Sequence, residues 1–147
     1  MVPETLNIYI AGWFGAQERL RKERDRIHAL GVGQVVGTWL DEETVAPEAP
    51  GETFVVGSTP EQCREYAVRD LGEVRYADLL ILDTIDVNPR GGREVEYGLA
   101  LATGIGLWIV GPKRNVFHYL AQGHFATWDE ALLALDLGVK PGERIQS

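Results

Sequence analysis

The sequence contains one cysteine, Cys63, in 147 residues. A single thiol excludes a disulfide within the chain and a metal site built from several thiolates of that chain. No apolar run approaches the ~20 residues that a membrane-spanning helix needs. The first residues, MVPETLNIYIAG, lack the basic region of a secretory signal. We therefore expect a soluble cytoplasmic protein.

Basic residues are also few, because 14 lysines and arginines stand against 22 acidic residues and give a formal net charge of -8. Such a surface repels a phosphate backbone, which argues against binding of a nucleic-acid polymer. A local pocket can still hold a nucleoside or a nucleotide. The length favours one domain over residues 1–147.

Several sequence motifs are missing as well. The chain has no GxxxxGK[ST] phosphate loop, no GxGxxG after its first apolar run, no GxSxG, and no hydroxyl-rich loop of the kind that binds flavin. Its histidines, at positions 28, 118 and 124, do not have a metal-ligand spacing. We therefore expect neither a metal nor an organic cofactor.

Apolar runs alternate with amphipathic segments along the chain, which predicts a parallel sheet with helices on both faces. The expected fold is a flavodoxin-like or Rossmann-like α/β three-layer sandwich of about four or five strands. Strands are predicted at 6–11, 34–40, 78–83 and 106–110, with a small strand or turn at 125–128. Helices are predicted at 16–30, 60–76, 94–103 and 115–122, with a last one capped by Asp129. The acidic 41–60 segment is interpreted as a flap.

Three features have two interpretations each. Trp13 and Phe14 follow Gly12 at the end of the first strand, where they form a pocket wall or simply fill the core. The arginines of segment 16–30 are interpreted as a solvated face paired with acids of the same helix, the alternative being phosphate binding. Asp70 shares a helix face with Tyr66, and composition alone favours a surface acid there.

Carboxylates stand where ligands bind in α/β sheets, at the carboxyl ends of the strands. Glu96 lies in the first turn of a predicted helix, where the helix dipole favours an ionised acid. An ionised carboxylate can attack a sugar C1, and a second, protonated acid can assist departure of the leaving group. Glu94 is the nearest competitor for the role of nucleophile.

Four segments, IYIAGWF (8–14), RDLGEVRYADLLIL (69–82), GGREVEYGLALATG (91–104) and PKRNVFHYL (112–120), resemble the nucleoside 2-deoxyribosyltransferases. The resemblance implies that Glu96 is the nucleophile, that the Tyr9 hydroxyl holds it, and that Asp70 exchanges a proton with the base. It also implies that Phe14 stacks on the base and that Asn115 reaches the sugar in a neighbouring subunit's site, so a homo-oligomer is expected. The further predicted substrate-binding residues are Gly12, Trp13, Asn88, Arg90 and Gly92.

The sequence departs from that family just before the Glu96 helix, where Arg90 occupies the register of an aspartate. Arg90 or Arg93 suits a 5′-phosphate, which related deoxynucleotide hydrolases need. The sequence thus predicts a nucleoside deoxyribosyltransferase that acts on small 2′-deoxynucleosides and free nucleobases. The alternatives are a 2′-deoxynucleoside 5′-monophosphate N-glycosidase and a non-catalytic nucleotide-binding module.

Overall fold

The computed structural model describes residues 5–42, 59–87 and 91–145. The predictions for Asn88, Arg90 and most of the 41–60 segment lie outside these residues. Along the chain the described elements are β1 (Leu6–Ala11), the 3₁₀ helix η1 (Phe14–Ala16), α1 (Gln17–Leu30), β2 (Gly33–Val35), η2 (Thr38–Asp41), α2 (Pro60–Tyr76), β3 (Leu79–Asp83), α3 (Gly92–Thr103), β4 (Gly106–Val110), η3 (Val116–Leu120), β5 (Gly123–Phe125) and α4 (Trp128–Asp136).

The strands form one parallel sheet in the order β2-β1-β3-β4-β5. This order confirms the predicted flavodoxin-like α/β fold. Every residue of β3 and β4 is buried, as their continuous apolar runs predicted. The connections diverge between β1 and β3, so the carboxyl ends of these two strands border the position at which such sheets bind ligands.

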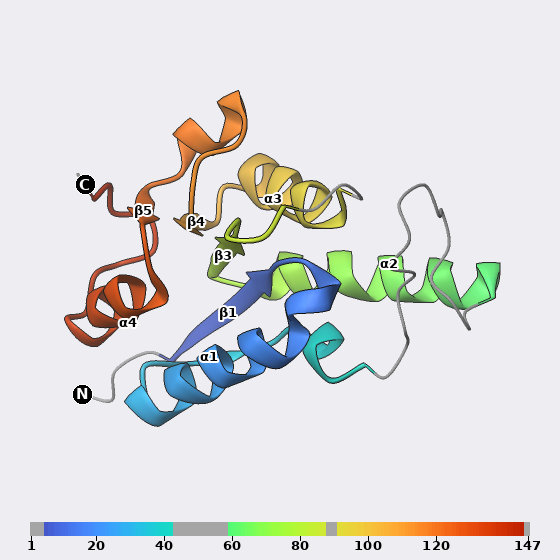
Figure 1. Ribbon diagram of the computed structural model, residues 1–147, viewed down its shortest axis with the longest axis horizontal. Coiled ribbons are helices and arrows are strands. Elements are labelled where there is room, and N and C mark those ends of the chain that lie inside the picture. The colour runs from blue at the N-terminus through green and yellow to red at the C-terminus, as the bar shows by residue number, and fades with distance from the viewer. Residues whose placement is uncertain (1–4, 43–58, 88–90, 146–147) are drawn as a thin grey trace.

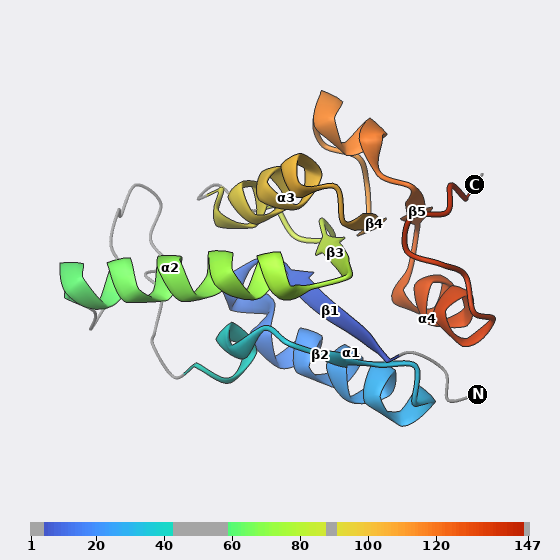
Figure 2. The same cartoon turned by 180° about the vertical axis from the view of Figure 1, so that it is seen from behind.

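Helices cover both faces of the sheet, with α1 and α4 on one side and α2 and α3 on the other (Figures 1 and 2). The N-terminal part of α2 extends beyond the sheet in both views, and Val74 is the one buried residue of this helix. Among the described helices, none is long and apolar enough to cross a membrane.

Helix caps follow the sequence signals in part. Thr59 and Gln62 form a reciprocal capping box at the start of α2, which confirms the predicted helix start. At α4 the cap is Thr127, whose side chain accepts from the Glu130 amide, so the prediction of Asp129 as the cap was wrong. Asp129 lies instead in the first turn of the helix.

The predicted strand at 34–40 was too long. β2 ends at Val35, and the chain then turns into η2. Trp39 explains the turn, because its ring is buried and its Nε1 donates to the Ile10 carbonyl at 2.8 Å. A tryptophan anchored to β1 in this way draws the chain across the end of the sheet. The predicted helix at 115–122 is likewise the short 3₁₀ helix η3.

The arginines of α1 connect the helix to other elements more than to itself, which corrects the solvated-face interpretation. Arg19 donates to buried Asp83 at 2.8 Å, and the Trp128 indole donates to the same carboxylate at 2.7 Å. These bonds join α1 and α4 to the end of β3. The other pairs that α1 arginines make with distant segments are Arg19–Asp86, Arg24–Asp41 and Arg26–Asp129.

Candidate active site

Glu96 projects from the first half of α3 toward α2 and the end of β1. Helix α3 begins after Gly91, whose φ of 77° is a left-handed conformation that favours glycine. Residues two apart on a helix point in very different directions. The side chains of Glu94 and Glu96 therefore face different parts of the protein. The hydroxyl of buried Tyr9 donates a hydrogen bond to Glu96 Oε2. The structure thus brings together these two residues, which lie 87 positions apart.

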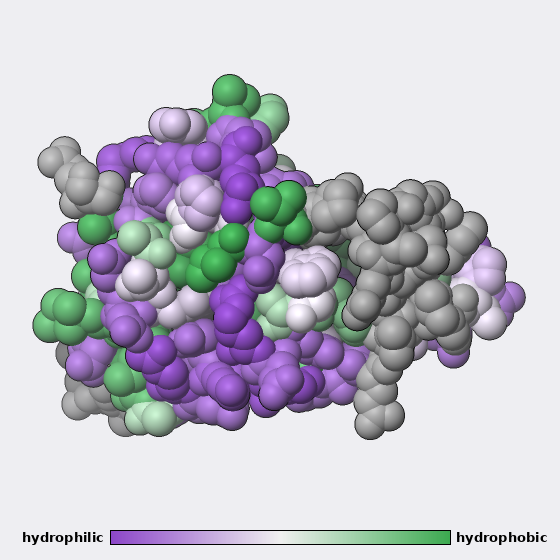
Figure 3. All heavy atoms as spheres, in the orientation of Figure 1, coloured by the Kyte–Doolittle hydropathy of each residue, from purple (hydrophilic) through white to green (hydrophobic). Residues whose placement is uncertain are grey.

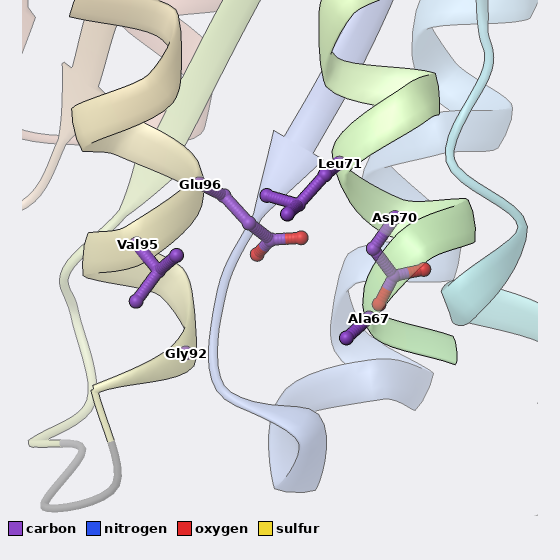
Figure 4. Close-up of a pocket in the computed structure, with 6 residues that line it drawn as sticks. All are labelled: Ala67, Asp70, Leu71, Gly92, Val95 and Glu96. Carbon is purple, nitrogen blue, oxygen red and sulfur yellow. The ribbon is translucent and has the colours of Figure 1, made fainter. Parts of the chain in front are cut away.

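A cavity of about 350 Å³ lies between α2 and α3, beside this pair. Figure 4 shows the Glu96 and Asp70 carboxylates entering it from the two helices, with apolar side chains around them. Its lining residues are Ala67, Asp70, Leu71, Gly92, Val95 and Glu96. A cavity with apolar walls and two convergent acids is the usual form of a small-molecule site.

Burial raises the pKa of Glu96 to about 8, with the negative charges of Asp70 and Glu73 acting in the same direction. The hydrogen bond from Tyr9 opposes this shift, because it stabilises the ionised carboxylate. Burial, Glu96 and Asp70 in turn raise the pKa of Tyr9, so its hydroxyl keeps its proton and remains a donor. The hydrogen bond from Tyr9 therefore stabilises the charged form of Glu96, whereas burial and the neighbouring negative charges destabilise that form.

Asp70 is half-buried on α2, with 25% of its side chain exposed. Burial raises its pKa, and a hydrogen bond from Arg69 acts against that rise. Asp70 is therefore a cavity-lining acid, unlike the surface acid that composition alone favoured. Two carboxyl groups with raised pKa values at one cavity are the arrangement from which acid and base roles arise.

Glu94 faces away from the cavity, toward η3. Its carboxylate contacts Nε2 of fully buried His118 at 2.9 Å and the Asn115 amide nitrogen at 3.3 Å. Because His118 Nδ1 accepts from the Arg114 backbone amide, the ring proton lies on Nε2 and is donated to Glu94. Asn115 also caps η3, with its side-chain oxygen accepting from the amides of residues 117 and 118. Glu94 and Asn115 thus fix η3 against α3.

The other predicted residues of this region lie close to the end of β1 or on α3. Gly12 lets α1 pack closely, since a Cβ there would lie 2.6 Å from Leu20 Cδ1. Phe14 packs on the Trp39 ring at 6.2 Å between centroids, and Trp13 is partly buried against the core. None of these three residues lines the cavity described above, whereas Gly92 does.

Arg93, considered above for a phosphate, is buried, and burial lowers its pKa. Its Nη1 donates to the backbone carbonyls of Asp83 at 3.1 Å and Asp86 at 2.7 Å. The side chain therefore ties the β3–α3 connection to the start of the helix. Nothing in these contacts directs its charge toward the cavity.

Two charged residues beside the cavity and its apolar lining residues were missed in the sequence. The apolar lining residues are Ala67, Leu71 and Val95. Arg69 contacts Asp70, and Glu73 contributes negative charge near both Tyr9 and Glu96. Both lie in the quoted segment RDLGEVRY, where spacing of four placed Arg69 and Glu73 on one helix face. That spacing was the available signal, but an exposed ion pair on a helix surface produces the same pattern.

Several solved structures are similar to this chain in fold, although no protein-family model and no curated protein sequence matches it. A 2-deoxyribosyltransferase from Bacillus psychrosaccharolyticus is similar over 95% of this chain and 99% of its own, with a TM-score of 0.68 and 18% identity. A conserved protein from Enterococcus faecalis V583 is similar over 91% and 99%, with a TM-score of 0.65 and 14% identity.

A third similar structure is the CMP N-glycosidase BcmB from Clostridium botulinum, over 89% of this chain and 98% of its own, with a TM-score of 0.52 and 18% identity. All three similarities extend over nearly the whole of each partner chain. The chain therefore has the fold of the 2-deoxyribosyltransferase and the N-glycosidase, as its sequence resemblance implied.

Proposed function

We propose that this protein is an enzyme that transfers 2-deoxyribose between nucleobases, with 2′-deoxynucleosides and free bases as its substrates. The observation that carries the proposal is the Tyr9–Glu96 hydrogen bond at a cavity that Asp70 enters from the opposite helix. A held carboxylate and a second acid across a small cavity are the parts that a retaining glycosyl transfer needs.

In the first step ionised Glu96 attacks C1′ with the oxygen that Tyr9 leaves free. A bond forms between Glu96 and C1′ while the bond from C1′ to the base nitrogen breaks. Its electron pair remains on the base, which takes the proton of Asp70. In the second step the nitrogen of an incoming base attacks C1′ and releases Glu96, and Asp70 accepts the proton that the incoming base loses. The two steps together retain the configuration at C1′.

A base-exchange assay tests this function. The purified protein is incubated with 2′-deoxyadenosine, 2′-deoxyuridine, deoxycytidine or thymidine, each with an acceptor base, and new nucleosides are measured by chromatography. Formation of a nucleoside that carries the acceptor base supports transfer. Absence of exchange with every donor and acceptor contradicts it.

Hydrolysis of 2′-deoxynucleoside 5′-monophosphates is the second candidate, because the BcmB neighbour is named as a CMP N-glycosidase. Water then replaces the incoming base in the second step. Turnover of deoxyadenosine is compared with that of dAMP, with and without an acceptor base. A strict phosphate requirement favours hydrolysis. The contacts of Arg93 do not favour it, because that guanidinium is buried against backbone carbonyls.

Replacing Tyr9 by phenylalanine tests the hydrogen bond on the nucleophile. Since Tyr9 lowers the pKa of Glu96 against the effect of burial, its loss moves that pKa upward from about 8. The nucleophile must be ionised, so we expect the acidic limb of the pH–rate profile to move to higher pH. At pH 7 the exchange rate falls about 10- to 100-fold, and less at pH 9. A profile that keeps its shape after the substitution contradicts this role.

We also propose a homo-oligomer in which a neighbouring subunit completes the site through η3. The Asn115 side chain, to which the resemblance assigned that contact, is engaged within its own chain by the η3 amides and Glu94. Two features support this. Val95 is 61% exposed at the cavity, and η3 presents large apolar side chains to solvent beside Asn115 (Figure 3, top of the molecule). These η3 side chains are Val116, Phe117, Tyr119 and Leu120. An apolar group of this kind on a small protein marks an interaction surface.

Replacing Phe117 by aspartate is expected to lower the molecular mass in sedimentation and to reduce exchange activity with it. A charge in the centre of an apolar interface is left without a partner, which costs about 2–5 kcal/mol. Leu133→Asp is the matched control, since Leu133 on α4 is also 58% exposed but lies on another element. Equal effects of the two substitutions contradict an interface at η3.

A further inference from the structure

The guanidinium of Arg69 lies among three carboxylates beside the cavity. Its Nη2 donates to Asp70 Oδ1 at 2.9 Å, and its Nε lies 3.3 Å from the same oxygen. Nε also lies 3.5 Å from Glu73 Oε1, and Nη2 pairs with Glu42. The carbon of the guanidinium sits 5.2 Å from the centre of the Tyr66 ring. One charged side chain thus contacts an acid of the cavity and two acids outside it.

Both contacts to Asp70 use one oxygen. Within the described part of the chain, Oδ2 of Asp70 has no hydrogen-bond partner. A carboxyl group held at one oxygen has a fixed plane, and its second oxygen then has a fixed direction. Figure 4 shows the Asp70 side chain on the α2 wall of the cavity, opposite Glu96. The oxygen that Arg69 leaves free is therefore the one available to carry a proton.

The outer contacts fix Arg69 itself. Glu73 accepts from the Thr38 backbone amide at 3.1 Å and from its hydroxyl at 3.0 Å. The Gln17 amide donates to the Glu42 carbonyl at 2.9 Å. The two acids that hold the outer side of the guanidinium are thereby attached to η2 and α1. Arg69 consequently has little freedom to leave Asp70, because its Nε and Nη2 are both engaged by protein carboxylates.

We propose that Arg69 is a positioning residue for Asp70, holding one carboxylate oxygen so that the other delivers the proton to the departing base. This inference rests on the transfer reaction proposed above. Arg69 also opposes the effect of burial on the pKa of Asp70. A proton held less tightly is released more readily to a nucleobase, which is a weak base. The residue acts through Asp70 and touches no reacting atom.

Comparison of two leaving groups tests the proposal. Nucleobases depart with a proton from the acid, whereas 4-nitrophenolate departs without one. We expect Arg69→Gln to lower kcat for 2′-deoxyadenosine about 10- to 100-fold with little change in KM, and to leave the release of 4-nitrophenolate from its 2-deoxyriboside within about threefold. Arg69→Lys, which keeps the charge and one donor, restores part of the loss.

Three further variants complete the test. Asp70→Asn is expected to show the same dependence on the leaving group, and the double variant is expected to be no slower than Asp70→Asn alone, because two residues that act as one unit are not additive. Arg64→Gln, at an exposed position of α2, is the control for loss of an arginine from this helix. Glu42→Gln removes the charge of an outer partner of Arg69, and a smaller loss confined to the nucleoside substrate is expected.

A purely structural role of Arg69 predicts equal losses with both substrates, and that result overturns the inference. The inference alone is also overturned if Asp70→Asn discriminates between the leaving groups and neither Arg69→Gln nor Glu42→Gln does. If the unchanged protein exchanges no base and releases no 4-nitrophenolate, the proposed function fails, and the inference fails with it. The Glu42→Gln variant decides the matter if Arg69→Gln does not fold.

Discussion

Replacing Glu96 by alanine is expected to lower base exchange by about four orders of magnitude or more, because the covalent step then has no nucleophile. The carboxylate of Glu96 on α3 is held by Tyr9 at the cavity. Water cannot replace it in the transfer, since retention of configuration requires two successive displacements at C1′, and the enzyme carboxylate enters in the first and leaves in the second. Exchange of 2′-deoxynucleosides with free bases, followed by chromatography, measures the loss.

Glu94→Ala is the matched control for this substitution. Glu94 lies two residues away on the same helix but contacts His118 and Asn115 instead of the cavity. We expect the Glu94 variant to form the covalent deoxyribosyl adduct and the Glu96 variant to form none. Mass spectrometry of the acid-quenched protein during turnover, with peptide mapping, detects the adduct. An adduct on the Glu96→Ala protein, or on any residue other than Glu96 in the unchanged protein, contradicts the assignment.

The fold follows from local patterns in the sequence. The buried runs of β3 and β4, the capping box at Thr59 and the alternation of strands with helices each determine structure over a few residues. Such signals predicted a parallel α/β sandwich correctly. They failed at 34–40, where the ring of Trp39 anchors to the Ile10 carbonyl and ends the strand early. A contact between residues 29 positions apart leaves no periodicity in the sequence.

The candidate site was also predictable from the sequence only where local motifs determine it. The helix of Glu96 and the β1 end were recognised from short motifs and from the resemblance to a family. However, α3 begins at Gly92, so its first turn holds Glu94 rather than Glu96, which the helix-dipole argument had placed there. The pairing of Arg69 with Glu42, and of Glu94 with His118, depends on the tertiary structure. Charged residues at helical spacing are most often solvated, so composition assigned the arginines of α1 to the surface. Only the packed structure shows that Arg19 meets the buried Asp83 carboxylate at the end of the central strand.

The raised pKa of Glu96 also has a consequence for stability, because the charge that the reaction needs is unfavourable in the folded state. An unfolded glutamate has a pKa near 4.5, and folding raises it to about 8. Between these values the folded state binds the proton more tightly, so stability falls as pH rises from about 4.5 and levels off above about 8. The stabilising contribution of protonated Glu96 is present at acidic pH and lost as Glu96 ionises.

Replacing Glu96 by glutamine removes that ionisation while keeping the shape of the side chain and an acceptor for Tyr9. We expect the variant and the unchanged protein to be about equally stable at pH 5. At pH 9 the variant is expected to be about 2–4 kcal/mol more stable, which is less than the full shift allows because the carboxylate is only partly shielded from water. Denaturant unfolding at the two pH values measures the difference.

Glu65→Gln is the control, because Glu65 is an exposed carboxylate on α2 and its loss reports the general effect of removing one negative charge from an acidic chain. The specific effect is the additional gain of the Glu96 variant at pH 9. A gain that is the same at pH 5 and pH 9 contradicts the assignment of a half-buried, ionising carboxylate at this position. A gain confined to high pH, together with loss of exchange activity, means that the site keeps its nucleophile at the expense of folding stability.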